Sequence, residues 1–184
     1  MIIGCDKDGV LSNFHKSYLT KYNELKKEDS EFTPIDINLE SEEYSFEHTD
    51  LIDQKIAKKI RKEYFGEIMD KSEMYVGADD FLLNISKYFS ETHVITHQFD
   101  NDSKLASLNW MYVHSLPYSC IFCDGLEKFK YCDVLIDDKI ENLRAMTHKG
   151  KIGICLAREW NKKYEGLRFH TYDEIIEFLK NIKK

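Results

Sequence analysis

The sequence predicts an α/β fold: a doubly wound, mainly parallel sheet with a small helical cap inserted after the first strand. Short apolar segments recur along the 184-residue chain, and segments with apolar residues at helical spacing separate them. Strands that alternate with helices pair in parallel through right-handed crossovers and place helices on both faces of the sheet. The alternation is broken once, where about eighty residues separate the first two strands, more than one crossover uses.

Five segments are predicted as buried strands because each is apolar and too short for a typical helix. They span residues 2–5, 93–96, 120–123, 134–136 and 152–156.

Helices are predicted where apolar residues recur every three or four positions. The side chains with that spacing are Phe81, Ile85 and Phe89, then Leu105, Leu108 and Tyr112, then Leu143 and Met146. The last helix has the clearest beginning, because Thr171 and Glu174 form a capping-box pattern ahead of an apolar run.

The long segment after the first strand is predicted to form the cap. Its residues 14–25 and 52–65 have helical spacing of apolar side chains. We expect residues 15–75 to form the helical insertion, and residues 1–14 and 76–184 to form the core domain. Proline and glycine are scarce, so no flexible linker divides the chain further.

Charge and hydropathy narrow the range of partners. The 26 Lys and Arg against 33 Asp and Glu give a net charge of -7, the wrong sign for a protein that binds polymeric nucleic acid. No apolar run approaches the roughly 18 residues that span a bilayer, so no membrane partner is expected. The amino end reaches Asp6 before any basic residue and lacks a long apolar stretch, which favours a cytoplasmic location over secretion.

Five cysteines in such a chain are predicted to be reduced thiols rather than a disulfide framework. The alternative is a zinc-dependent interaction module built on Cys120, Cys123 and Cys132. A structural zinc site commonly uses two closely spaced ligand pairs, and the second pair is missing here.

Two pairs of acidic residues mark the ends of predicted strands. Asp6 and Asp8 follow the first strand, and Asp137 and Asp138 follow the fourth. If both strands are central and parallel, their carboxyl ends are adjacent and the four carboxylates converge. Like charges at close range are costly without a cation, and an oxygen-only ligand set at a site for anions favours Mg²⁺.

The chain carries, in this order, the acidic end of the first strand, the hydroxyl of Thr96, Lys128 and the Ile-Asp-Asp ending of another strand. In these features the chain resembles the haloacid dehalogenase-like (HAD) phosphohydrolase superfamily. Within it the chain is most similar to the 5'(3')-deoxyribonucleotidase family. The matching residues are Asp6-x-Asp8-Gly-Val-Leu-x-x-Phe14, Gly77-Ala78, Lys104, Trp110 and Leu135-Ile-Asp-Asp138. This resemblance implies a HAD-like Rossmannoid core, a phosphoric monoester hydrolase of the 5'-nucleotidase type, and Mg²⁺ as cofactor.

Covalent phosphoryl transfer is the chemistry that these residue types allow. Asp6 would attack phosphorus and form an aspartyl phosphate. Asp8 would protonate the leaving oxygen and later take a proton from water. Thr96 and Lys128 would hold the phosphoryl oxygens, with Lys130 as the alternative lysine.

Four residues make up the expected metal site, namely Asp6, Asp8, Asp137 and Asp138. The resemblance implies that Asp8 contributes its backbone carbonyl. The sequence leaves open which of Asp137 and Asp138 binds the ion directly.

The chain departs from the family pattern directly after Thr96. The family usually has a small residue, Pro and soon an Arg at this point, whereas this sequence continues His97-Gln98-Phe99. We expect His97 or Gln98 to replace the arginine and count His97 among the substrate-binding residues. The simpler interpretation of His97 is a hydrogen-bonded neighbour of the site.

Selectivity is expected to come from Phe14 and from aromatic residues of the cap. The resemblance implies that these rings flank a base, and the cap candidates are Tyr44, Phe46, Tyr64, Phe65 and Tyr75. The expected substrate is therefore a small phosphate ester, a (deoxy)nucleoside monophosphate, and a homodimer is considered as the assembly. The alternatives are a HAD phosphatase for another small ester such as a sugar phosphate, and a non-catalytic binding protein on the same scaffold.

Overall fold

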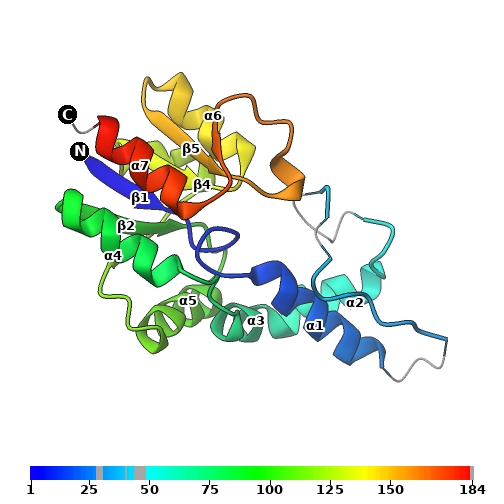
Figure 1. The fold of residues 1–184 in the computed structure, drawn as a ribbon. Coiled ribbons are helices and arrows are strands. Elements are labelled where there is room, and N and C mark those ends of the chain that lie inside the picture. Colours follow the sequence, from blue (N-terminus) through cyan, green and yellow to red (C-terminus); the bar gives the residue numbers. More distant parts are fainter. Residues whose placement is uncertain (28–30, 40, 44–48, 183–184) are drawn as a thin grey trace.

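The computed structural model describes residues 1–27, 31–39, 41–43 and 49–182. A six-stranded sheet lies at its centre, with the order β3-β2-β1-β4-β5-β6 and every neighbouring pair parallel (Figure 1). The strands are β1 (Ile2–Cys5), β2 (Glu91–Thr96), β3 (Ser119–Phe122), β4 (Val134–Asp137), β5 (Ile152–Leu156) and β6 (Leu167–Phe169). The predicted doubly wound α/β fold is confirmed, and β1, which carries the first acidic pair, lies between β2 and β4.

Helices pack on both faces of this sheet because successive strand residues point to opposite sides. Ile3 and Cys5 face a large apolar cluster that includes residues of α4 (Ala78–Tyr88), α5 (Asn101–Val113) and α7 (Tyr172–Ile182). Gly4 faces the other side, where Ile95 and Leu135 pack with Met146 of α6 (Ile140–His148). The apolar runs that form β1, β2, β4 and β5 are therefore strands buried from both sides, whereas β3, predicted as buried, lies at the edge of the sheet and is only partly buried.

Two details of the core differ from the predicted elements. Strand β6 was not predicted, because it has only three residues and a central Arg168. Helix α5 forms as predicted, but Leu105 and Tyr112 are 66% and 83% exposed, and the apolar side chains that it buries are Trp110 and Met111. A helical repeat of apolar residues identified the helix without identifying the face that it buries.

The segment between β1 and α4 forms a second group of helices beside the sheet (Figure 1). It contains α1 (Phe14–Lys26), α2 (Gln54–Lys59), the π-helix η2 (Ile60–Tyr64) and α3 (Phe65–Lys71). These helices share their own buried cluster around Leu19 and Ile60. The division of the chain into a cap of residues 15–75 and a core domain of residues 1–14 and 76–184 stays a prediction.

The chain enters and leaves this helical group through two adjacent segments. The amide of Asn13 donates to the carbonyl of Glu73, and the amide of Tyr75 donates to the carbonyl of Leu11. Ser12 and Met74 form an antiparallel bridge between them. The residues that follow Asp6 and Asp8 are thereby tied to the segment that returns to the sheet.

The described part of the chain has no helix with the length and hydropathy needed to cross a membrane.

Candidate active site

Three neighbouring strands bring the predicted polar residues to one edge of the sheet. Asp6 follows β1, Thr96 ends β2 and Asp137 ends β4, and these strands lie side by side in the order β2-β1-β4. All three side chains are almost completely buried. Parallel pairing therefore produces the convergence that the chain order predicted.

Lys128 bridges two of the carboxylates from the 3₁₀-helix η3 (Gly125–Lys130). Its ammonium Nζ lies 2.9 Å from Oδ1 of Asp6 and 2.7 Å from Oδ2 of Asp137. The Lys128 side chain is 1% exposed, whereas Lys130 pairs with Glu127 at the surface. The structure places Lys128, and not Lys130, in the site.

Asp8 has a separate set of hydrogen-bond donors. Its Oδ1 accepts from Lys7 Nζ at 2.9 Å and from the Ser12 hydroxyl at 2.8 Å. Its Oδ2 accepts from Nε2 of Gln98 at 3.0 Å, and the same amide lies 3.2 Å from the Thr96 hydroxyl. Gln98 thus lies between the ends of β1 and β2. The sequence indicated that either His97 or Gln98 would replace the arginine of the family pattern.

The turn after Asp8 requires glycine for two reasons. Gly9 has a φ of 78°, in the left-handed region that side chains other than glycine rarely adopt. A Cβ at this position would also collide with the carboxylate of Asp138. The close approach of this turn brings Asp138 next to the end of β1.

The two acidic residues at the end of β4 differ in how their oxygens are satisfied. Both carboxylate oxygens of Asp137 accept hydrogen bonds, from the Lys139 amide, the Asn142 side chain and Lys128. Asp138 accepts one from Nε1 of Trp160 on Oδ2, and its buried Oδ1 has no hydrogen-bond partner in the described part of the chain. A buried oxygen with an open lone pair suits a metal ligand.

Asp6, Asp137 and Asp138 form the one group of potential metal ligands found among the described residues. One carboxylate oxygen from each lies within 4.8 Å of the others. All donors are oxygens, which fits a hard cation such as Mg²⁺. The cysteines of the alternative zinc site form no such group within residues that the structure describes, and all five are free thiols.

Burial and like charge shift the acid equilibria of the cluster. Burial, together with Asp137 and Asp8 and against the opposing effect of Lys128, raises the pKa of Asp6 to about 7. Burial and then the charges of Asp137 and Asp6 raise the pKa of Asp138 well above its usual range. Burial disfavours the charge of Lys128, but Asp137 and Asp6 outweigh it and raise its pKa. A divalent cation would relieve the repulsion among these carboxylates.

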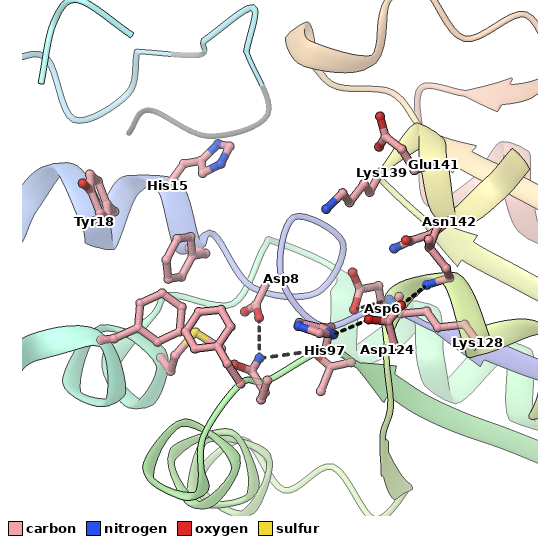
Figure 2. A pocket seen from close by; sticks show the side chains of 18 of the residues that line it. Asp6, Asp8, His15, Tyr18, His97, Asp124, Lys128, Lys139, Glu141 and Asn142 are labelled. Atoms are coloured by element: carbon pink, nitrogen blue, oxygen red, sulfur yellow. Dashed lines mark hydrogen bonds and ion pairs between the residues drawn. The ribbon is translucent and has the colours of Figure 1, made fainter. Parts of the chain in front are cut away.

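The cluster opens into a pocket of about 580 Å³ between the sheet and the helical group (Figure 2). Figure 2 shows Asp6, Lys128 and Asn142 on one side and His15 and Tyr18 of α1 across from them. The remaining predicted site residues that line this pocket are Asp8, Phe14, Thr96 and His97.

The far end of the pocket is aromatic. The ring centroid of Phe65 lies 5.4 Å from that of Phe14 and 4.7 Å from that of Phe99. The guanidinium of Arg61 lies 5.1 Å from the Phe99 ring. His97 also lines the pocket and is half exposed, with its Nδ1 4.0 Å from Oδ2 of Asp124.

The predicted cap aromatics separate into three groups. Phe65 lines the pocket. Tyr64 packs in the helical cluster around Leu19, and Tyr75 packs against the core with Arg158 over its ring. Tyr44 and Phe46 lie outside the described residues. Arg61 and Phe99 were not predicted, since they are distant in sequence and carry no motif.

Comparisons with known proteins identify the family of this chain. A family model described as "5' nucleotidase, deoxy (Pyrimidine), cytosolic type C protein" matches residues 1–184. The chain belongs to this family. It is a phosphoric monoester hydrolase of the 5'-nucleotidase type, as the resemblance implied.

A curated relative in Chlorobaculum tepidum, named "Putative 5'(3')-deoxyribonucleotidase", is 23% identical over 98% of this chain and 90% of its own length. Among solved structures, a HAD hydrolase of Entamoeba histolytica matches with a TM-score of 0.63 and 18% identity, over 100% of this chain and 99% of that one. A HAD family hydrolase of Deinococcus radiodurans, solved with bound phosphate and sodium, matches with a TM-score of 0.64 and 12% identity, covering 98% and 95%. These structural likenesses establish the HAD-like fold.

Proposed function

We propose that this nucleotidase is a Mg²⁺-dependent phosphatase that hydrolyses (deoxy)nucleoside monophosphates through an aspartyl phosphate on Asp6. The observation that carries the proposal is the contrast between two carboxylates two residues apart. Asp6 is buried beside Lys128 and the other acidic residues, whereas Asp8 stands at the pocket with its own donors. Asp6 lies in the acidic group that suits Mg²⁺, where a bound ion would keep its carboxylate ionised as the nucleophile, and Asp8, held apart from that group, is free to transfer the proton.

In the first step, an oxygen of Asp6 attacks phosphorus and the bond to the ester oxygen breaks. Asp8, protonated at that point, gives its proton to the leaving oxygen, and the nucleoside departs as an alcohol. Asp8 then takes a proton from water, whose oxygen attacks phosphorus and breaks the bond to Asp6. Inorganic phosphate is released, and both carboxylates return to their starting states.

Lys128 and Thr96 are assigned to the phosphoryl oxygens. Lys128 lies beside the attacking oxygen of Asp6, where its charge would stabilise charge that develops on the phosphoryl group. Asp137 holds Lys128 in this position and has no open oxygen of its own. Asp137 is therefore better suited to orient the lysine than to bind metal directly.

The residues suited to hold Mg²⁺ are Asp6 and Asp138, with the backbone carbonyl of Asp8 that the resemblance implies. The unpartnered oxygen of Asp138 supports this assignment. When bound, the ion supplies positive charge that offsets the acidic cluster and the phosphoryl oxygens.

The aromatic end of the pocket supports a nucleotide over a smaller ester. Stacking on an aromatic ring is worth about 1 to 3 kcal/mol per base, and Phe14, Phe65 and Phe99 form a row of rings there. We assign the base to this row and the sugar to the space between it and Asp8. A cytoplasmic location belongs to the same proposal, in line with the family description.

A phosphate-release screen tests the function. Purified protein is incubated with nucleoside and deoxynucleoside monophosphates and with sugar phosphates, in Mg²⁺ or in excess chelator. We expect release from nucleotides in Mg²⁺ and none in chelator. Preferential release from sugar phosphates would move the assignment to the other small-ester phosphatases, and release from no ester would favour a binding protein.

A further inference from the structure

Lys7 is a buried lysine between the two catalytic carboxylates, and the mechanism above gives it no role. Its side chain is 0% exposed. The ammonium Nζ lies 2.9 Å from Oδ1 of Asp8, 3.4 Å from the Ser12 hydroxyl and 3.4 Å from the carbonyl of Met69. It also lies 4.6 Å from the ring centroid of Trp110. A buried ammonium is costly without such partners, and within the part of the chain that the structure describes Lys7 forms its ion pair with Asp8.

The contacts around Lys7 fix the direction in which Asp8 points. Lys7 and Ser12 hold Oδ1, so Oδ2 is the oxygen that meets Gln98 at the pocket. The Asp8 side chain is 20% exposed, which leaves it accessible to a bound ester. Without Lys7, the carboxylate loses its charged anchor and keeps two neutral donors.

Lys7 is itself held from the side of the helical group. The Trp110 ring below the ammonium is fixed by a 2.6 Å hydrogen bond from its Nε1 to the carbonyl of Ser72. Ser72 directly follows α3, and Met69 lies within it. The position of Asp8 is thus linked, through Lys7, to the helix that also carries the pocket residue Phe65.

We propose that Lys7 is a positioning residue, whose ammonium holds the Asp8 carboxylate where it can protonate the leaving oxygen. This inference rests on the proposed function. Lys128 contacts Asp6 and Asp137, so the two buried lysines have separate tasks. Lys7 acts through Asp8 alone, and its effect should be confined to the steps in which Asp8 moves a proton.

Leaving-group dependence separates this role from a structural one. A nucleoside leaves as a strongly basic alkoxide unless it is protonated, whereas p-nitrophenolate leaves readily without a proton. In single-turnover experiments with Mg²⁺, Lys7→Met should slow phosphoryl transfer from a deoxynucleoside monophosphate by roughly 10- to 100-fold, the scale of a misplaced catalytic group. Transfer from p-nitrophenyl phosphate should fall far less. The Mg²⁺ concentration for half-maximal rate should stay unchanged.

Lys21→Met is the matched control, because Lys21 also pairs with a carboxylate, Glu67, and lies 5.1 Å from a ring, that of Tyr64. It does not line the pocket. This variant should leave the ratio of the two substrates unchanged. If Lys7→Met does not fold, Lys7→Gln keeps an uncharged N–H donor group and much of the length, and the same ratio is measured with it.

The decisive comparison places Lys7→Met in an Asp8→Asn background. If Lys7 acts through Asp8, the double variant should be no slower than Asp8→Asn alone, because coupled residues are not additive. Additive losses, or equal losses on both substrates, would overturn the positioning role while leaving the proposed function intact. A wild-type protein that releases phosphate from neither ester would overturn the proposed function itself and the inference with it.

Discussion

The two ends of the pocket are built in opposite ways. At the sheet end, Asp6, Asp137 and Lys128 are buried and joined by ion pairs of 2.7 and 2.9 Å. At the helical end, Phe65 and Phe99 face each other through rings whose centroids are 4.7 Å apart, and Phe99 is about half exposed. The first end is fixed by charge and directional hydrogen bonds, and the second offers apolar faces.

Under the proposed function, this difference separates chemistry from selectivity. The charged end can recognise a phosphoryl group but has nothing that distinguishes one alcohol from another. The proposal assigns no step of phosphoryl transfer to the aromatic end, and stacking on its rings would favour a base. Changes at the sheet end should therefore affect every phosphate ester, and changes at the aromatic end should affect nucleotides alone.

The largest effect is expected from Asp6→Asn. The amide is a far poorer nucleophile and metal ligand than the carboxylate, so Mg²⁺-dependent turnover should be lost on nucleotides and on small esters alike. Circular dichroism should show a retained fold. Turnover of either substrate comparable to wild type would remove Asp6 from the mechanism.

Asp8→Asn should have the next largest effect. Loss of proton transfer is expected to slow both steps by roughly 100- to 10,000-fold. Mg²⁺ affinity should be largely kept, because the resemblance gives the ion the backbone carbonyl and not the side chain. Isothermal titration with Mg²⁺ checks this, and an affinity loss as severe as that of Asp6→Asn would mean that the two roles are wrongly assigned.

Phe14→Ala tests the aromatic end. Loss of one stacking face should lower kcat/KM for deoxynucleoside monophosphates by roughly ten-fold or more, since about 1.4 kcal/mol is a factor of ten. Hydrolysis of a small generic phosphate ester should hardly change. Phe14 also packs against Tyr18 and Phe65, so equal losses on both substrates would show a general structural role.

The pH dependence of Mg²⁺ binding should be smaller, up to about ten-fold per pH unit for one competing proton. Burial raises the pKa of Asp6 to about 7 in the metal-free protein, and the ion needs the carboxylate. Mg²⁺ affinity, measured by titration between pH 6 and 8, should therefore increase with pH. An affinity that is flat across this range would show that the ion displaces no proton there from either Asp6 or Asp138.

The same pKa shift has a consequence for folding. The folded state binds the Asp6 proton more tightly than the unfolded chain, whose ordinary pKa is 3.8. Stability from this group is present below that value and is lost as the pH rises through about 7. In chelator, the melting temperature should fall across this window, and Mg²⁺ should reverse much of the loss.

The part of the site that follows strand order could be predicted from the sequence. Asp6, Thr96 and Asp137 each end an apolar run, and parallel strands place their carboxyl ends at one edge. The assignment of Lys128 over Lys130 also agrees with the structure. Asp6, Thr96 and Asp137 could be predicted because one rule, the pairing of parallel strands, determines where they lie.

The parts that depend on side-chain direction could not be predicted. The spacing of Leu105 and Tyr112 suggested a buried helical face, but α5 buries Trp110 instead, whose Nε1 reaches Ser72. The sequence does not indicate that Lys7 is buried, because its contact with the ring of Trp110 joins residues far apart in the chain. Phe99 and Arg61 meet from segments far apart in the chain, and no local pattern indicates such a contact.

One measurement tests the separation of chemistry from selectivity most directly: the ratio of kcat/KM for a deoxynucleoside monophosphate to that for deoxyribose 5-phosphate, in Mg²⁺. The two esters present the same phosphoryl group to the sheet end and differ by the base at the aromatic end. We expect the nucleotide to be favoured by roughly ten-fold or more, the scale of one stacked base. Equal values, or a preference for the sugar phosphate, would contradict the assignment of the aromatic end to base recognition.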